Sequence, residues 1–255
     1  MKKLDELFGV VIMLGVSPLL FAGSPYQQGD GLHGIIGLGV LFRTEPIETV
    51  DNRIWPLPLL IMRHGNFFID GLEMGYHAVE GVNGQINIIF RPRLEGFDTN
   101  DSAFLDGMAD RDFSIDGGIS STWRQKTLEV KFSAVTDVLR KNKGKEMTLS
   151  VGNTYILTGR MLLFTPSLGL RWQSEEVINY YYGVIPSEAR ADRPAYKGEA
   201  TMNYITAINA TYSLSKRSTL FVDVEYERFG DDISDSPLVE GEQIFTVFFG
   251  YGWQF

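Results

Sequence analysis

The sequence predicts an all-β chain that closes into a transmembrane antiparallel up-and-down β-barrel of about twelve strands, with both termini in the periplasm. Three observations predict this fold class. Apolar and polar residues alternate along segments of about ten residues, aromatic residues gather near the ends of these segments, and the last segment is an aromatic strand. Alternation with a period of two gives a strand two faces that meet different surroundings.

The composition fits this class and excludes several others. The 27 glycines and the 13% aromatic content suit short twisted strands joined by turns. The chain has no cysteine, which excludes a disulfide framework and a thiolate zinc site. A net charge of −9 argues against binding nucleic acid through a basic patch. No run after the N-terminus approaches the roughly 20 apolar residues that a membrane-spanning helix needs.

Residues 1–22 have the order of a signal peptide. Lys2 and Lys3 precede the apolar stretch Leu7–Val16, and Ala22 and Gly23 offer small residues at a cleavage site. Residues 23–255 would then form the barrel of the exported protein. The alternative interpretation is a buried N-terminal helix, which would require a soluble core to pack against.

The first four strands are expected in the part of the chain with the weakest pattern. Pro56 and Pro58 interrupt the second of them, and proline within a strand is typical of an edge or a bulge. A hairpin with its tip at Gly71 separates the third from the fourth. If residues 66–80 were instead one strand, the strand number would be eleven. Bacterial barrels have an even number, which favours the hairpin. These strands are expected at residues 34–42, 55–63, 66–70 and 73–80.

The remaining strands show a clear alternation. In one of these strands, one face carries Ile86, Ile88, Phe90 and Leu94, and the other carries Asn87, Arg91 and Arg93. A soluble sandwich can show the same pattern, but its strands are usually about five or six residues long, shorter than these. The connections alternate between short and long, as expected for periplasmic turns and outer loops. These strands are expected at residues 84–94, 112–124, 127–138, 146–157, 160–173, 200–214, 218–229 and 242–255.

The last strand carries an aromatic row up to a terminal phenylalanine. As an ordinary soluble edge strand, this row would be exposed to water and would promote aggregation. Facing lipid, it resembles the signal by which the barrel-assembly machinery of the outer membrane recognises its clients. We expect that signal at Phe249, Tyr251, Trp253 and Phe255.

The search for catalytic, cofactor and metal sites finds no candidate that we retain. The three histidines, His33, His64 and His77, lack metal-site spacing, and no Gly-x-Ser-x-Gly motif is present. His77 is the best candidate for an embedded enzyme because Glu73 is expected on the same inward face, but a structural role is favoured. We therefore expect no enzymatic activity and no cofactor.

Charged residues of both signs are expected on the inward face of the strands. One interpretation makes them a selectivity lining for small solutes, and the other, which is favoured, makes them an ion-pair network that fills the lumen and holds strand register. The acidic outer segments 97–112 and 231–242 are expected to be solvated loops. The predicted lumen residues are Arg91, Arg93, Lys131, Arg171, Glu129, Asp223, Glu225 and Glu227.

Two outer segments resemble the MltA-interacting protein family, also called MipA/OmpV. One runs from Phe104 through Leu105-Asp106-Gly107-Met108 to Arg111, and the other contains Tyr182-Gly183-Val184 followed by Glu188 and Tyr196. The resemblance spans nearly the whole chain after residue 22 and is weakest before residue 80. It implies a scaffold that brings a lytic transglycosylase together with a murein synthase during peptidoglycan remodelling. Because the family has no agreed binding motif, no site is carried over.

Two alternatives to a scaffold stay open, and the partners differ among them. The chain could be a small-solute channel or a surface adhesin, or, less favoured, an embedded lipid-modifying enzyme. In each case we expect it in the outer membrane of a Gram-negative bacterium, in contact with lipid and lipopolysaccharide, after insertion by the barrel-assembly machinery. A murein hydrolase and a murein synthase are expected partners for a scaffold only.

Overall fold

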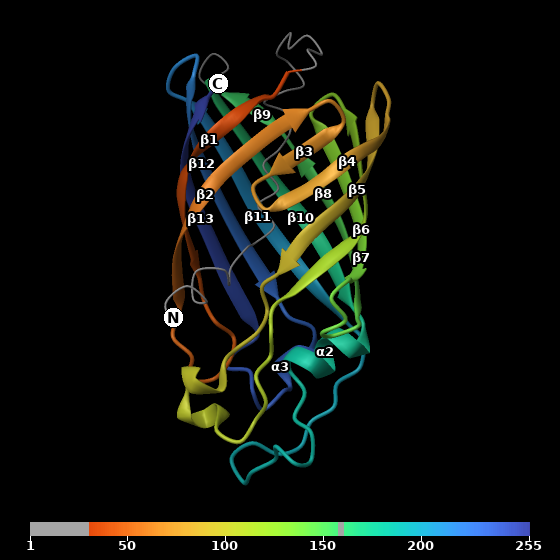
Figure 1. The fold of residues 1–255 in the computed structure, drawn as a ribbon, viewed down its shortest axis with the longest axis vertical. Helices are drawn as coiled ribbons and strands as arrows, with labels where there is room; N and C mark the ends of the chain where they lie inside the picture. Colours follow the sequence, from red (N-terminus) through yellow and green to blue (C-terminus); the bar gives the residue numbers. More distant parts are fainter. Residues whose placement is uncertain (1–30, 158–160) are drawn as a thin grey trace.

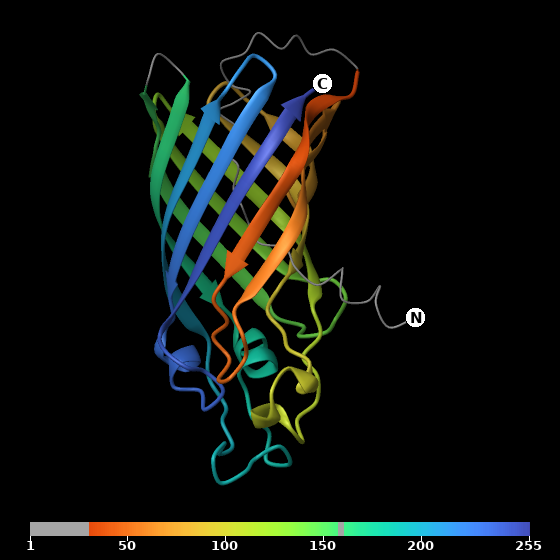
Figure 2. The same ribbon diagram turned by 90° about the vertical axis from the view of Figure 1, so that its left-hand side faces the viewer.

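The computed structural model describes residues 31–157 and 161–255, which form a closed antiparallel barrel (Figures 1 and 2). The predicted signal peptide at residues 1–22 lies outside the described residues, as do residues 23–30 and 158–160. None of the helices among the described residues is long and apolar enough to cross a membrane.

The barrel wall has twelve crossings, which confirms the predicted number. Thirteen strand segments are present, but β8 and β9 are two parts of one crossing that is interrupted at Thr154. The strands are β1 (His33–Arg43), β2 (Arg53–His64), β3 (Phe67–Asp70), β4 (Glu73–Glu80), β5 (Gly84–Arg93), β6 (Ser114–Gln125), β7 (Leu128–Asp137), β8 (Lys145–Asn153), β9 (Tyr155–Leu157), β10 (Leu162–Gln173), β11 (Thr201–Ser213), β12 (Ser218–Arg228) and β13 (Gln243–Gln254).

Each crossing pairs with its neighbours in the sequence, and the first strand pairs with the last. β1 and β13 run antiparallel from Ile35 opposite Gln254 to Arg43 opposite Thr246, which closes the sheet. The strands are tilted against the barrel axis, and the C-terminus lies at the end where the short turns are (Figure 2). The even strand number and the hairpin at Gly71 are therefore as predicted, and Gly71 takes a φ of 62° at that tip.

The interruption between β8 and β9 has a cause in the sequence. Ser213 N–H donates to the Met161 carbonyl, so odd-numbered residues of β10 direct their backbone groups towards β11. Pro166, with an even number, directs its ring nitrogen towards the other neighbour and has no hydrogen to donate. The ladder passes from Phe164 opposite Tyr155 to Ser167 opposite Gly152, leaving Asn153 and Thr154 opposite Thr165 and Pro166.

The long loops fold into a packed cap over one end of the barrel. The cap contains two short helices, α2 (Glu175–Tyr181) and α3 (Asp231–Ser234), and two 3-10 turns, η2 (Thr99–Asp101) and η3 (Ala103–Leu105), all at the end opposite the short turns (Figure 2). Its buried core comes from the loops after β1, β5, β10 and β12. It consists of Ile47, Phe97, Leu105, Met108, Val177, Ile178, Tyr181, Tyr182, Val184, Phe229, Ile233, Leu238 and Ile244. The acids of segments 97–112 and 231–242 are mostly exposed, as expected for solvated loops, but the apolar residues between them pack together, which was not predicted.

Candidate functional site: a charged lumen beneath a closed cap

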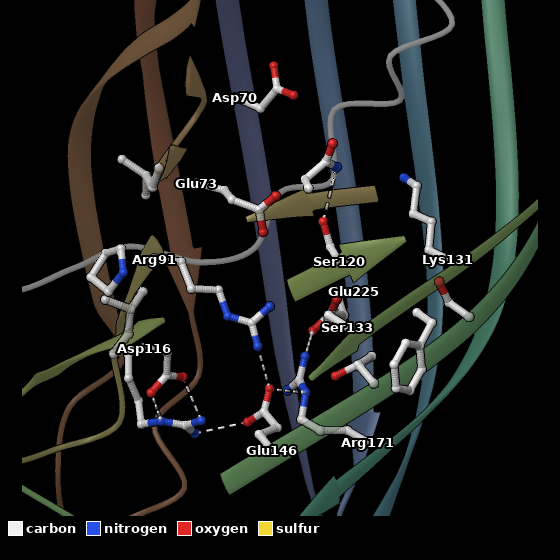
Figure 3. A pocket seen from close by; sticks show the side chains of 18 of the residues that line it. Asp70, Glu73, Arg91, Asp116, Ser120, Lys131, Ser133, Glu146, Arg171 and Glu225 are labelled. Atoms are coloured by element: carbon white, nitrogen blue, oxygen red, sulfur yellow. Dashed lines mark hydrogen bonds and ion pairs between the residues drawn. The ribbon is translucent and has the colours of Figure 1, made fainter. Parts of the chain in front are cut away.

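The lumen is crossed by a network of charges centred on Glu146 of β8. Its carboxylate lies 2.8 Å from Nη2 of Arg91, 2.9 Å from Nη1 of Arg93 and 3.7 Å from Nε of Arg171. Figure 3 shows Glu146 between Arg91 and Arg171, and Arg93 also pairs with Asp116. One carboxylate thus ties β5 and β10 to β8 across the interior.

The arginines of this network have further acidic partners. Arg93 donates through Nη2 to Asp116 at 2.7 Å, and Arg171 bonds Glu227 and lies 3.5 Å from Glu225. Glu227 also accepts a hydrogen bond of 2.7 Å from the Asn203 amide. The network therefore joins β5, β6, β8, β10, β11 and β12.

The network lies directly under the cap. Arg93, Glu146 and Glu227 stand near those ends of their strands that lead into the long loops. Gln173 donates to Glu146 at 3.2 Å and to Glu95, in the loop after β5, at 3.4 Å. Arg93, Glu146 and Glu227 each expose no more than 5% of their surface. Burial on this scale is tolerated only because each charge has opposite charges and hydrogen bonds around it.

The predicted lumen residues all lie on the inner face but fall into separate groups. Arg91, Arg93, Arg171, Glu225 and Glu227 belong to the network around Glu146.

Nearer the short turns, Glu129 pairs with Arg124 at 2.6 Å and with Lys131 at 3.0 Å. Asp223 accepts a hydrogen bond from Asn209. The sequence therefore placed these side chains on the correct face but did not show which of them meet.

Sequence reasoning missed the centre of the network and one wall of the lumen. Glu146 is the first residue of an expected strand. Thr148, Ser150 and Gly152 follow at every second position and are polar or small, so this pattern could have placed Glu146 on the inner face. The missed wall is apolar and lies on β1, β2, β12 and β13. It is formed by Ile35, Leu41, Leu59, Ile61, Phe221 and Phe248. Runs of consecutive apolar residues, such as Leu59-Leu60-Ile61 and Leu220-Phe221-Val222, indicate strands that are apolar on both faces.

A cavity of about 200 Å³ lies in the lumen beside the network. Its lining includes Glu73, Ser120, Lys131 and Ser133, which Figure 3 shows around the open space. His77 lines it too, but its Nδ1 lies 2.7 Å from Asn87 Oδ1 and its ring stacks on Phe68 at 4.6 Å. These contacts give His77 a packing role. No group of three or more potential metal ligands is found in residues 31–157 and 161–255.

The outer mouth is held shut by contacts between two loops. Arg111 donates to Glu188 at 2.8 Å, and the Ala109 N–H donates to the same carboxylate at 3.0 Å. Burial alone raises the pKa of the Glu188 carboxyl, but the Ala109 N–H and the Arg111 guanidinium together hold that pKa below its usual range. Arg193 is fully buried and donates to the backbone carbonyls of Phe104, Asp106 and Glu188.

Residues 36–255 match the family model described as "MltA-interacting protein MipA". The chain belongs to this family. Among curated relatives, the MltA-interacting protein of Escherichia coli K12 is 25% identical, covering 90% of this chain and 92% of its own length. The putative outer membrane protein YiaT of Escherichia coli K12 is also 25% identical, over 86% of this chain and 90% of its own. Outer membrane protein OmpV of Vibrio cholerae is 28% identical over 72% of each.

The solved structures with a similar fold include a porin and an outer-membrane channel. The NanC porin has a TM-score of 0.42 at 9% identity and covers 86% of this chain and all of its own. The COG4313 channel of Pseudomonas putida F1 has the same TM-score and identity and covers 91% of this chain and 99% of its own. The relatives locate this family member in the outer membrane of a Gram-negative bacterium, and none of them bears the name of an enzyme.

The two segments that carry the family resemblance meet in the cap. Residues 104–111 and 182–196 contain Arg111 and Glu188, the ion pair between the loops. The two segments on which the family resemblance rests therefore contact each other in the cap.

The aromatic row in and just after β13 lies on the outer face of the barrel wall, away from the lumen. Phe249, Tyr251, Trp253 and Phe255 each expose between 43% and 52% of their surface, as lipid-facing side chains do. Their recognition by the barrel-assembly machinery stays a prediction.

Proposed function

We propose that this protein is a closed outer-membrane barrel that anchors murein-remodelling enzymes at its periplasmic end. The observation that carries the proposal is the plugged lumen: ion pairs cross the interior and a packed cap covers the outer mouth. A barrel closed in this way offers its turns and outer wall to partners. The name of the relative from Escherichia coli, MltA-interacting protein, supports the choice of partner.

The buried network makes an open pore costly. Removing one partner from a buried ion pair typically costs about 3–5 kcal/mol, because it leaves an uncompensated charge. A solute pathway along the axis would have to separate Glu146 from Arg91, Arg93 and Arg171. The closed arrangement is therefore the stable one for a barrel with this sequence.

The periplasmic turns carry basic side chains that suit an acidic partner surface. Lys126 lies in the turn between β6 and β7, and Lys216 and Arg217 lie in the turn between β11 and β12. All three are exposed, although the chain as a whole has a net charge of −9. Turns offer little area, and stable interfaces bury roughly 1,600 Å², so we expect a weak contact guided by charge.

The test reverses the three turn charges in the full-length protein. The variant K126E/K216E/R217E should recover about tenfold less lytic transglycosylase and murein synthase in pull-downs from envelope membranes, because an acidic partner would be repelled. The matched control R140E/K143E/K197E makes the same charge change in outer loops and should recover wild-type amounts. Equal recovery by both variants, or no murein enzyme with the wild type, would overturn the proposal.

A small-solute channel is the second candidate, favoured by the cavity of about 200 Å³ lined by charges of both signs. Planar bilayers containing the heat-modifiable, folded protein separate the two functions. A scaffold with a plugged lumen should be electrically silent. Steady openings whose ion selectivity changes in the R91A variant would instead make transport the leading function.

A further inference from the structure

The barrel wall has a break on one side, between β2 and β5. β3 is only four residues long and pairs with Ile61–His64 alone. Residues 53–60 of β2 therefore have β1 as their only ladder partner among the described residues. In Figure 1 the hairpin of β3 and β4 fills only the half of this wall nearer the short turns. We call the break, bounded by residues 53–60, the tip Gly71-Leu72 and residues 91–94, the lateral gap.

Prolines stand where the strand edges face the lateral gap. The Gly71 N–H donates to the Leu60 carbonyl, so even-numbered residues of β2 direct their backbone groups towards this side. Pro56 and Pro58 have that parity.

On β5 the Gly84 carbonyl accepts a hydrogen bond from the Gly81 N–H, so even-numbered residues of β5 direct their backbone groups towards β4. The last residue of β5 that pairs with β4 is Phe90, and Pro92 lies beyond it. An unpaired N–H in hydrocarbon costs several kcal/mol. Proline at these positions removes that cost.

At its outer end the lateral gap is closed by Arg53. Its Nη2 donates to the Gly96 carbonyl at 3.3 Å and lies 3.4 Å from Asp101. The lateral gap is thus bounded at the loop end by a side chain and at the other end by the hairpin, and it opens sideways from the barrel.

Two hollows lie on either side of the hairpin. Inside, the cavity of about 200 Å³ is lined near the hairpin tip by Leu72, Pro92 and Leu94. Outside, a groove of about 380 Å³ runs over the hairpin. Its lining is largely apolar and consists of Leu32, Met62, Arg63, His64, Phe67, Phe68, Ile69, Met74, Gly75, Tyr76, Ile88 and Phe90. Phe68 lines both hollows, and at the tip the groove reaches Ile69 and Met74, next to Asp70 and Glu73 of the cavity lining.

The lumen wall behind the lateral gap is apolar. The inward side chains of β2 in this stretch are Trp55, Leu57 and Leu59, which belong to or pack on the apolar cluster that includes Phe221 and Phe248. Leu94, at the opposite border, packs against the same cluster. A hydrocarbon chain entering here would meet apolar surface on one side and the charged network on the other.

We propose that the lateral gap admits an acyl chain of a membrane phospholipid from the outer groove into the lumen. The bilayer supplies this occupant, because the groove lies on the lipid-facing wall and the lateral gap opens at its end. Against Trp55 and Leu57 the chain keeps apolar surroundings like those of the bilayer, so entry does not expose its methylenes to water. The inference does not depend on the scaffold proposal, since it concerns the wall and not the periplasmic turns.

Tryptophan quenching by brominated acyl chains tests the proposal. Of the four tryptophans, Trp55 points inward, whereas Trp123 and Trp253 expose 41% and 47% on the lipid face. The variant W123F/W172F/W253F retains only Trp55 and is reconstituted, without detergent, into vesicles of phosphatidylcholine with bromines at stepped chain positions. We expect at least about half the fractional quenching found when Trp253 alone is retained, because a chain in the lumen contacts Trp55 directly.

A tryptophan behind an intact wall is the matched control. Ile205 is buried and shares the parity of the inward residue Asn203 on β11, which is paired on both sides from Tyr204 to Tyr212 and does not contribute to the apolar cluster behind the lateral gap. In a background without native tryptophans, I205W should show little quenching in the same vesicles. An unquenched Trp55, or equal quenching at 55 and 205, would overturn the proposal.

A second measurement uses the wild-type chain, in case a variant does not fold. A phospholipid with a diazirine on its acyl chain should label Trp55 or Leu57 upon illumination. Labelling confined to outward residues such as Ile54 would contradict entry.

Discussion

At the scale of single residues, Glu146 is the side chain on which most of the lumen depends. It contacts three arginines from two strands and exposes only 4% of its surface. Glu225, on the same inner face, has a longer contact of 3.5 Å to Arg171 and a side chain exposed by 20%. Glu146 is therefore both more deeply buried and closer to more positive charges than Glu225.

Replacing Glu146 should therefore destabilise the barrel far more than replacing Glu225. We expect E146Q to cost about 3–5 kcal/mol, because the three guanidiniums lose their shared counter-charge inside the protein. E225Q should cost no more than about 1 kcal/mol, as for a solvated pair. The urea midpoint of the heat-modifiable band in lipid vesicles measures both. Similar midpoints for the two variants would show that the network is solvated in the membrane.

At the scale of elements, the cap is held by few polar contacts around an apolar core. Glu188 joins the two loops that carry the family resemblance through Arg111 and the Ala109 N–H. Its pKa in the folded state lies below its ordinary value, so the charged form stabilises the closed cap. That stabilisation is fully present above the pKa of the unfolded state, about 4.3, and is lost as the pH falls through the folded pKa.

Acidification should therefore loosen the cap in the wild type. Between pH 5 and about pH 3 we expect the protection of the Ala109 amide, corrected for the intrinsic pH dependence of hydrogen exchange, to fall, because protonated Glu188 accepts its hydrogen bond only weakly. Between about pH 5 and pH 8 Glu188 contributes no change. In E188Q the amide should exchange quickly at every pH, and most of the change in protection between pH 5 and pH 3 should disappear. If E188Q shows the full change, other carboxyls of the loops must cause it.

The positions of the strands were predictable from the sequence where one face is apolar and the other polar. They were less predictable where both faces are apolar. Alternation along β5, β7 and β11 gave their positions and inner faces, because lipid and lumen select opposite side chains. Leu94 was expected on the lipid face with Ile88 and Phe90, but it lies past the end of β5 and packs inward. Pairings such as Glu146 with Arg171 depend on strand stagger, which alternation does not specify. The buried core of the cap was not predicted, because its apolar residues are separated in the sequence by acidic ones.

At the scale of the whole molecule, ion pairs cross the lumen of the barrel and the strand pairing of its wall is interrupted at two places. Prolines mark both interruptions: Pro166 faces the break between β8 and β9, and Pro56, Pro58 and Pro92 face the lateral gap. The strands that join the ends of the chain, β1 and β13, are by contrast paired along almost their full length. Closure of the barrel thus depends on the pairing of β13 with β1.

The terminal residue of β13 should matter for assembly in the cell more than for the stability of the finished barrel. Phe255 and Phe245 both face outward and expose 48% and 41% of their surface, so F255A and F245A lose similar contacts with lipid. If the aromatic row is a recognition signal, F255A should lower the amount of heat-modifiable protein in the outer membrane severalfold, whereas F245A should not. Both variants should refold into lipid vesicles with similar yields, because that reaction needs no assembly machinery. A loss in vesicles as large as the loss in cells would assign Phe255 a structural role and remove the basis for a signal.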